Sequence, residues 1–193
     1  MIEQYQQAVA QYRQRIYSFA YYSLRSPEDA EDVTQDVLIK LWQNWQKIDH
    51  NKLSAWLMRV AHNQVIDLVR RRKKQMENTD EFATPDQHPA KDEDVGRSLD
   101  EETFRHRLMH GIRKLDDPFR SIIIMRDIQG QTYDDIKYCL ELSESQVKVY
   151  LHRARRKLRE DSELRRLYED NTLQNGAHRV KLTPMKIVNQ MHN

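Results

Sequence analysis

Apolar residues recur every three or four positions in three stretches of the first 75 residues, and charged or amide side chains fill the positions between them. This spacing is typical of amphipathic helices. The stretches cover residues 5–23, 26–45 and 53–74, and the polar segment "KIDHNKL" separates the last two. We therefore predict three helices, the third of which ends in the basic run "RRRKK" at 70–74.

The second stretch opens with a helix start signal. Ser26 is a suitable N-cap, Pro27 occupies the first helical position, and Asp29 stands where a capping box places its side-chain acceptor. Further along, Trp42 falls among apolar residues at helical spacing, so we place its side chain in the core.

A similar pattern returns in the second half of the chain. Residues 103–115 predict one helix, and "DDPFRSIIIMRDI" predicts another that starts with a capping aspartate before its proline. Two shorter helices follow, with capping pairs at Thr132 and Asp135 and at Ser143 and Gln146. Two short capped helices joined by a tight turn, the second strongly basic, have the layout of a helix-turn-helix.

The composition changes sharply between the two halves. Residues 77–102 hold ten carboxylates against two basic side chains and almost no large apolar residues. Such a segment cannot bury a core, so we predict a flexible acidic linker there. We divide the chain into domains at 1–76 and 103–166, with residues 167–193 as a poorly ordered tail.

Composition bounds the fold and excludes some kinds of site. Among 193 residues, 32% are charged and only four are glycine and five proline, which favours helices with short turns and an all-α fold. The mean hydropathy is −0.92. The single cysteine, Cys139, excludes an internal disulfide and a four-cysteine metal site, and we expect it to be a small core residue. With no signal peptide or membrane span recognisable, we expect a cytoplasmic protein without membrane insertion.

The last predicted helix carries the strongest candidate chemistry. Its apolar positions, from Val147 to Leu158, fall on one face, and Lys148, His152 and Arg153 lie on the opposite face with Arg156. Cations on an exposed helix face can neutralise phosphates and read guanine edges, so we interpret this helix as a nucleic-acid contact. The alternative is a solvated face, because cations suit the carboxyl end of any helix.

Two other groups allow more than one interpretation. Asp29, Asp32 and Asp36 share a helix face and could hold a metal with His50 or His62, as in a nuclease, but acidic first turns also suit the helix dipole. Trp56 could be a core residue or could wall a pocket for an unstacked base.

Two long blocks resemble a known family. "PEDAEDVTQDVLIKLWQNW" and "LSAWLMRVAHNQVIDLVRRRKK" resemble region 2 of bacterial RNA polymerase sigma factors, and "LDDPFRSIIIMRDIQGQTYDDIKYCLELSESQVKVYLHRARRKLRE" resembles region 4. The short length and the missing intervening module resemble the extracytoplasmic-function (ECF) type. The resemblance covers roughly residues 5–75 and 103–160. It implies two small helical domains joined by a linker, a region 2-like bundle and a region 4-like helix-turn-helix.

The resemblance also implies roles for particular residues. The surface that binds core RNA polymerase would hold Asp32, Gln35, Asp36 and Ile39. The loop "IDHNKLS" would capture a flipped base, and the contacts to the minus-ten element would be Asn51, Lys52, Trp56, Arg59, Asn63, Asp67, Arg70 and Arg71. The contacts to the minus-thirty-five element would be Ser145, Gln146, Lys148, Tyr150, His152, Arg153, Arg155 and Arg156, with Arg155, Arg156 and the helix start near phosphates. Promoter DNA and an anti-sigma factor would be further partners, and no cofactor, metal or catalytic residue is implied.

Three residues depart from the family pattern. Lys137 and Glu141 stand where relatives usually have a small residue and a glycine at the helix-turn-helix bend, and a non-glycine residue at positive φ costs about 1–2 kcal/mol. We therefore expect a reshaped turn. His152 occupies a position that is often apolar or aromatic, so the promoter preference of relatives does not transfer. A rival interpretation is a regulator that binds DNA through residues 103–160 and another protein through its first half.

Overall fold

The computed structural model of the protein describes residues 2–77 and 99–161. Residues 78–98 of the predicted linker and the whole predicted tail, 167–193, lie outside the described residues. The described helices divide into two compact units, an amino-terminal unit that contains α1 to α3 and a carboxy-terminal unit that contains α4, α5, residues 133–137 of α6, and α7. Within the described ranges every regular element is a helix, which confirms the predicted all-α class with two small helical domains.

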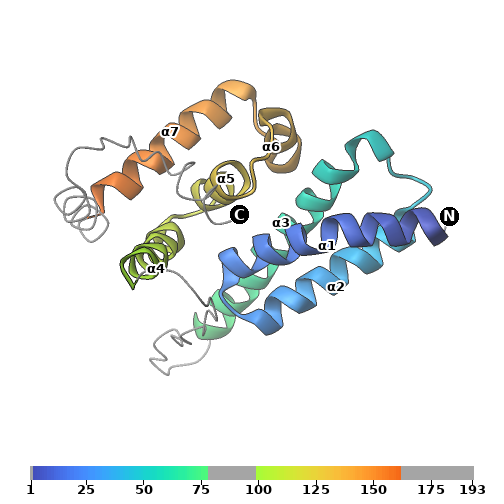
Figure 1. Ribbon diagram of the computed structural model, residues 1–193, viewed down its shortest axis with the longest axis horizontal. Coiled ribbons are helices and arrows are strands. Elements are labelled where there is room, and N and C mark those ends of the chain that lie inside the picture. Colours follow the sequence, from blue (N-terminus) through green and yellow to red (C-terminus); the bar gives the residue numbers. More distant parts are fainter. Residues whose placement is uncertain (1, 78–98, 162–193) are drawn as a thin grey trace. The chain divides into compact units, whose positions relative to one another are not determined.

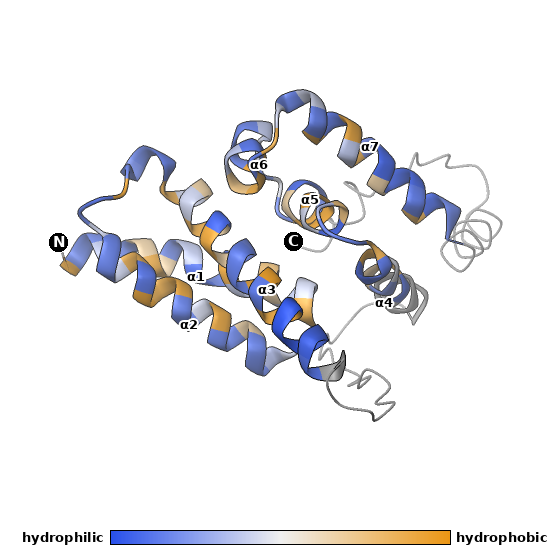
Figure 2. Ribbon diagram, turned by 180° about the vertical axis from the view of Figure 1, so that it is seen from behind, coloured by the Kyte–Doolittle hydropathy of each residue, from blue (hydrophilic) through white to orange (hydrophobic). Residues whose placement is uncertain are grey.

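The amino-terminal unit is a three-helix bundle. Its elements are α1 (Ile2–Leu24), α2 (Pro27–Asn44), the short 3-10 helix η1 (His50–Lys52) and α3 (Leu53–Glu77). α1 and α2 run antiparallel and side by side, and α3 packs against both (Figure 1). Figure 2 shows that hydrophobic and hydrophilic positions alternate along these helices, and that the basic end of α3 is hydrophilic.

The core of this unit comes from all three helices. Phe19 of α1, Leu41 of α2 and Leu57 of α3 are almost completely buried. Trp45 joins them at 7% exposure, whereas Trp42 is 46% exposed. The prediction that Trp42 lies in the core was therefore wrong. Residues 42 and 45 are both compatible with an apolar stripe at spacings of three and four, and the helix rotation that buries Trp45 turns Trp42 outward.

The start of α2 forms largely as predicted. Ser26 is the N-cap, its hydroxyl accepts a bond from the Asp29 backbone N–H (3.1 Å), and Pro27 takes the first helical position. The Asp29 carboxylate, expected to complete a capping box, instead pairs with the Arg72 guanidinium of α3 at 2.6 Å from each oxygen. The acidic start of α2 is thereby bonded to the basic end of α3.

The carboxy-terminal unit contains more breaks than the periodicity suggested. Its elements are α4 (Leu99–Lys114), α5 (Phe119–Ile123), the π-helix η2 (Ile124–Ile128), α6 (Tyr133–Leu140) and α7 (Glu144–Glu160). The single helix predicted after residue 118 therefore changes pitch at Ile124, where Gln129 N–H bonds to the Ile124 carbonyl (3.0 Å). The core is formed by the apolar side chains of Leu108, Ile112, Ile122, Ile123, Ile124, Met125, Ile136, Cys139, Val147, Leu151 and Leu158.

Of the three caps predicted in this unit, two are confirmed. Thr132 and Asp135 exchange backbone-to-side-chain bonds of 3.1 and 3.3 Å, and Ser143 and Gln146 form a complete capping box at the start of α7. The prediction of a capping aspartate before α5 was wrong. Pro118 holds the N-cap position, and its side chain has no atom that could accept a hydrogen bond. The Asp117 carboxylate precedes the cap and accepts a bond from the Ser121 hydroxyl.

The turn between α6 and α7 is closed by a left-handed residue. Glu141 has φ of 55°, and Leu142 N–H bonds back to the Lys137 carbonyl (3.2 Å). Glu141 thus adopts the left-handed conformation that a glycine would adopt. We had expected a reshaped turn, and at this position that expectation was wrong. The left-handed region is strained for a residue with a β-carbon.

Within residues 2–77 and 99–161, no helix combines the length and the apolar character that crossing a membrane requires.

Candidate nucleic-acid and polymerase interfaces

Helix α7 has one buried side and one exposed side. Val147, Leu151 and Ala154 are almost completely buried, as predicted for the apolar stripe, and Leu158 continues them. On the opposite side the structure exposes five side chains that we call the outward face of α7: Ser145, Val149, His152, Arg153 and Arg156. Because residues near the start of the second helix of a helix-turn-helix contact base edges, this face is the candidate DNA-reading surface.

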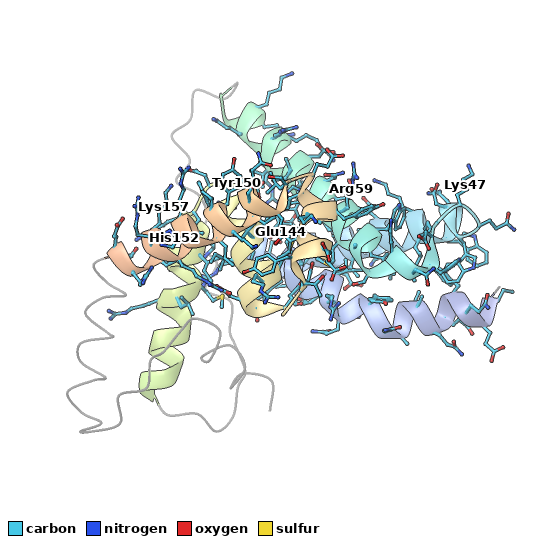
Figure 3. The ribbon with its side chains drawn as sticks, turned by 90° about the horizontal axis from the view of Figure 1, so that it is seen from above. Lys47, Arg59, Glu144, Tyr150, His152 and Lys157 are labelled. Atoms are coloured by element: carbon cyan, nitrogen blue, oxygen red, sulfur yellow. The ribbon has the colours of Figure 1, made fainter. Side chains whose placement is uncertain are left out.

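The flanks of α7 carry side chains that already have partners within the unit. Figure 3 labels Tyr150 and Lys157 on one flank of the helix and Glu144 on the other. The Tyr150 ring meets Phe119 edge to face at 5.5 Å, and the Lys157 ammonium lies 4.8 Å from the centre of the same Phe119 ring. Tyr150, predicted to read the minus-thirty-five element, is therefore half-buried beside α5.

Lys148 and Glu144 form an exposed ion pair one turn apart. Their charged atoms are 2.5 Å apart. The hydrogen bond between them lowers the pKa of Glu144 and raises the pKa of Lys148. Exposed pairs of this kind add little stability, so a phosphate can compete with Glu144 for the Lys148 ammonium.

Arg155 faces inward, unlike its neighbours on α7. Its guanidinium donates to both carboxylate oxygens of Asp127, with 2.9 Å between Nε and Oδ2. The Asp127 side chain is 1% exposed, and it projects from the π-helical segment η2. The bonds to Asp127 raise the pKa of Arg155. Its predicted role near phosphates stays a prediction, and in this structure the guanidinium fixes α7 to η2.

Helix α3 presents a second exposed polar face. Asn63, Asp67, Arg70 and Arg71 are exposed along it, and Trp56 and Arg59 are half-buried nearer its start. Helical spacing puts these six residues on one side, opposite the buried side chains of Leu57, Met58, Ala61 and Val65. The residues predicted to contact the minus-ten element thus share one surface.

The loop before α3 is held by local contacts. Asp49 caps η1 by accepting the Asn51 backbone N–H (3.0 Å), and the His50 ring meets Trp45 at 4.7 Å. This leaves the Asn51 and Lys52 side chains exposed. The loop therefore presents an amide and a cation next to Trp56, on a backbone that its own cap orders.

The residues predicted to bind polymerase lie together on α2. Asp32, Gln35, Asp36 and Ile39 are all exposed on one side of the helix, and Ile39 is 53% exposed. Trp42 lies one turn further on this side, and its ring contacts Tyr5 at 5.0 Å. An exposed aromatic beside an aliphatic residue is typical of protein interfaces, so Trp42 extends the candidate polymerase surface.

Two of the three aspartates considered as metal ligands are engaged in other contacts. Asp29 pairs with Arg72, and Asp36 accepts a bond from Gln64 of α3 (3.2 Å). Among the described residues, no three histidine, cysteine, aspartate or glutamate side chains come together in a way that could hold a metal ion.

Two surface residues and one buried residue were not predicted in these roles from the sequence. Trp42 was assigned to the core, Asp127 was not singled out as a partner for Arg155, and Val149 was not noticed on a helix dominated by charge. Only Val149 had a usable signal, because it stands two positions from Val147 and helical spacing places it on the opposite side. The partner of Arg155 lies 28 residues away and no periodicity reveals it.

The comparisons with known proteins agree with this arrangement. The family description "Sigma-70 region 2" matches residues 8–75, and "Sigma-70, region 4" matches residues 104–158. The chain is 30% identical over 158 residues to the ECF RNA polymerase sigma factor SigW of Bacillus subtilis. The matched region covers 77% of this chain and 83% of SigW. It is also 30% identical over 153 residues to the ECF sigma factor SigE of Mycolicibacterium smegmatis, covering 79% of this chain. That match spans 59% of the SigE length.

Solved structures show the same fold. The sigma factor RpoE of Bartonella quintana, solved with the anti-sigma factor NepR, superposes with a TM-score of 0.67 at 24% identity over 85% of this chain and 98% of that one. CnrH, solved with the cytosolic domain of CnrY, superposes with a TM-score of 0.60 at 24% identity, covering 82% of this chain and 86% of CnrH. With both regions matched in order and a relative at 30% identity over most of its length, the chain belongs to the ECF family of RNA polymerase sigma factors.

Proposed function

We propose that this chain is a promoter-recognition subunit, which binds core RNA polymerase, directs it to particular promoters and promotes DNA opening. The observation that supports this most is the presence of both sigma regions in one chain, each with an exposed polar face opposite its core. Two weak DNA contacts carried by one polymerase act at high effective concentration, so each small unit needs only modest affinity.

The amino-terminal unit would bind polymerase and the minus-ten element. Asp32, Gln35, Asp36 and Ile39 of α2 would contact the polymerase, and the faces of η1 and α3 would contact DNA. Unpairing a base costs roughly a few kcal/mol. Stacking of a base on an aromatic side chain recovers about 1–3 kcal/mol, which Trp56 could supply beside Asn63.

The carboxy-terminal unit would read the minus-thirty-five element as closed duplex. Arg153 lies on the outward face of α7, where a guanidinium can bond to a guanine edge, and Arg156 one turn later would neutralise a phosphate. Ser145, Gln146 and Lys148 would contact the backbone near the helix start. We also propose domain boundaries at 1–76 and 103–166, with a linker at 77–102 and a tail at 167–193.

Under this proposal the chain itself catalyses no reaction. The polymerase would form the phosphodiester bonds, and this chain would supply binding energy that differs between promoter and bulk DNA. Because polymerase and promoters are cytoplasmic in bacteria, we propose a cytoplasmic location. RpoE and CnrH were both solved with partners, and the partner of RpoE is described as an anti-sigma factor, so we propose that an anti-sigma factor is a further partner of this chain.

Transcription in vitro tests the proposal. Core polymerase free of other specificity subunits is mixed with genomic DNA, with and without the chain, and the transcript start sites are mapped. We expect new start sites that share two sequence elements upstream. Random starts, or none, would contradict the proposed function.

Two rival functions predict other outcomes. A regulator that binds DNA through α7 alone would not associate with core polymerase in a pull-down, whereas we expect association that Asp32→Ala and Ile39→Ala weaken. A nuclease would cleave DNA in the presence of Mg²⁺ or Mn²⁺ and lose this activity on Asp32→Ala, whereas we expect no cleavage by either protein.

A further inference from the structure

An aliphatic side chain occupies the centre of the outward face of α7. Val149 is 44% exposed, and it lies between the polar side chains of Ser145, His152 and Arg153 on this face. Helical spacing places it on the side opposite Val147, and therefore at the point of α7 that extends furthest from the core of its unit. Val149 is not among the residues that the sequence analysis assigned to DNA contact.

A single exposed valine needs no explanation in most places on a protein surface. The position of Val149 is what distinguishes it. It is the sixth residue of α7, which begins at Glu144 with a complete capping box, so it lies in the second turn. In helix-turn-helix proteins the early turns of the second helix are the part that contacts base edges.

The major groove offers little apolar chemistry to such a side chain. Each base edge there presents hydrogen-bond donors and acceptors, and the group that packs against aliphatic side chains is the C5 methyl of thymine. Both Val149 methyl groups lack hydrogen-bonding capacity, so contact with a donor or acceptor edge would only desolvate that edge. Thymine is therefore the base that suits this position.

We infer that Val149 determines specificity by contacting the C5 methyl group of one thymine in the upstream promoter element. This inference rests on the proposed function, because it requires α7 to lie in the major groove of that element. Arg153 lies one turn further along the same face, about 6 Å along the helix axis. The thymine should consequently lie within about two base pairs of the guanine that Arg153 reads, at about 3.4 Å per base pair.

Replacing thymine by deoxyuridine tests the contact, because it removes only the methyl group. The duplex carries the promoter that is mapped by in vitro transcription, and each thymine of the upstream element is replaced in turn. Binding of holoenzyme reconstituted with the full chain is measured by fluorescence anisotropy. One replacement should weaken wild-type binding about fourfold, the effect of exposing one methyl-sized group to water.

The same replacements with the V149A holoenzyme complete the cycle. V149A should bind the thymine duplex about as weakly as wild type binds the critical deoxyuridine duplex, and should not distinguish the two DNAs. The matched control is V69A, because Val69 is another exposed valine (38%) and lies on α3 away from the proposed DNA face. V69A should retain the full thymine preference.

Several results would overturn the inference. These are an upstream element without thymine, wild-type binding that no replacement weakens, or a V149A holoenzyme that keeps its thymine preference. Equal weakening of V149A on every duplex, or loss of its association with core polymerase, would assign Val149 to a sequence-independent or protein contact instead. Failure of the proposed function is recognised separately, because the wild-type holoenzyme would then not bind the unmodified promoter selectively.

Discussion

Helices α3 and α7 both expose a polar face opposite a buried one, but they are built and held differently. α3 has 25 residues, starts at the η1 loop beside half-buried Trp56, and reaches its cationic run only in its last turns. α7 has 17 residues, starts at a capping box, and distributes cations along most of its length. Aromatic and amide groups suit unstacked bases, whereas cations suit the backbone and groove edges of a duplex. Under the proposed function the two helices would therefore contact two different states of DNA.

The contacts that fix α3 and α7 within their units differ as well. The buried side of α3 rests on large apolar residues of two other helices, such as Phe19 and Leu41. α7 also has a buried stripe, but one of its cations, Arg155, is bonded to the buried Asp127. α3 has an ion pair of its own, between Arg72 and Asp29 of α2, but the Asp29 side chain is 16% exposed whereas that of Asp127 is 1% exposed. The orientation of α7 should thus depend more strongly on its ion pair than the orientation of α3 does.

The largest expected effect comes from removing that ion pair. Arg155→Ala leaves the Asp127 carboxylate buried without its partner, so the carboxy-terminal unit should lose about 3–5 kcal/mol. The three tryptophans, Trp42, Trp45 and Trp56, all lie in the amino-terminal unit. Urea unfolding followed by tryptophan fluorescence should therefore stay unchanged, while the far-ultraviolet circular dichroism transition of the other unit shifts to lower urea.

Arg156→Ala is the matched control for this experiment. Arg156 is an exposed neighbour on α7 that pairs with the equally exposed Glu160 at 3.4 Å, so its removal should change stability by at most about 0.5 kcal/mol. Equal effects of the two substitutions would show that the Asp127 contact does not hold α7 in place.

A smaller effect should separate base reading from phosphate contact on α7. Arg153→Ala should weaken promoter binding by about 1–3 kcal/mol and relax the preference at one base pair. Arg156→Ala should weaken binding to all sequences alike and reduce the salt dependence. Holoenzyme binding to a set of single-base variants, at two salt concentrations, measures both. Uniform weakening by Arg153→Ala would reassign it to a phosphate.

The smallest effect concerns the turn that leads into α7. Glu141 holds φ of 55°, so Glu141→Gly should stabilise the carboxy-terminal unit by about 1 kcal/mol. Glu141→Ala keeps a β-carbon and should give no such gain, which makes it the control. The urea transition followed by circular dichroism checks this, and an equal gain from both substitutions would mean that backbone strain is not the cause.

Local patterns predicted most of the helices, because amphipathic spacing and caps are determined by residues close in sequence. The start of α2 at Ser26 and the capping box of α7 at Ser143 are of this kind. Spacing alone could not decide between Trp42 and Trp45, since both satisfy the same helical repeat. The choice depends on how α1 and α3 pack against α2.

Longer-range features were beyond such patterns. Nothing in "IIIMRDI" distinguishes a π-helical turn from an α-helical one, and the pairing of Asp127 with Arg155 joins residues 28 positions apart. The sequence therefore predicted the candidate site on α7 as a set of exposed cations. The structure shows that Arg153 points outward, whereas Arg155 points inward to Asp127. The difference between these two arginines is set by tertiary packing, which the local pattern does not encode.

Binding of two mutant holoenzymes to closed and pre-opened promoter DNA tests the central claim most directly. Both DNAs carry the mapped promoter, and in one of them the minus-ten strands are mismatched so that its bases are unpaired. At low temperature, Arg153→Ala should weaken binding to both DNAs equally, whereas Trp56→Ala should weaken binding to the pre-opened DNA alone. If both substitutions weakened binding to both DNAs to the same extent, the assignment of α7 to duplex and α3 to opened DNA would be contradicted.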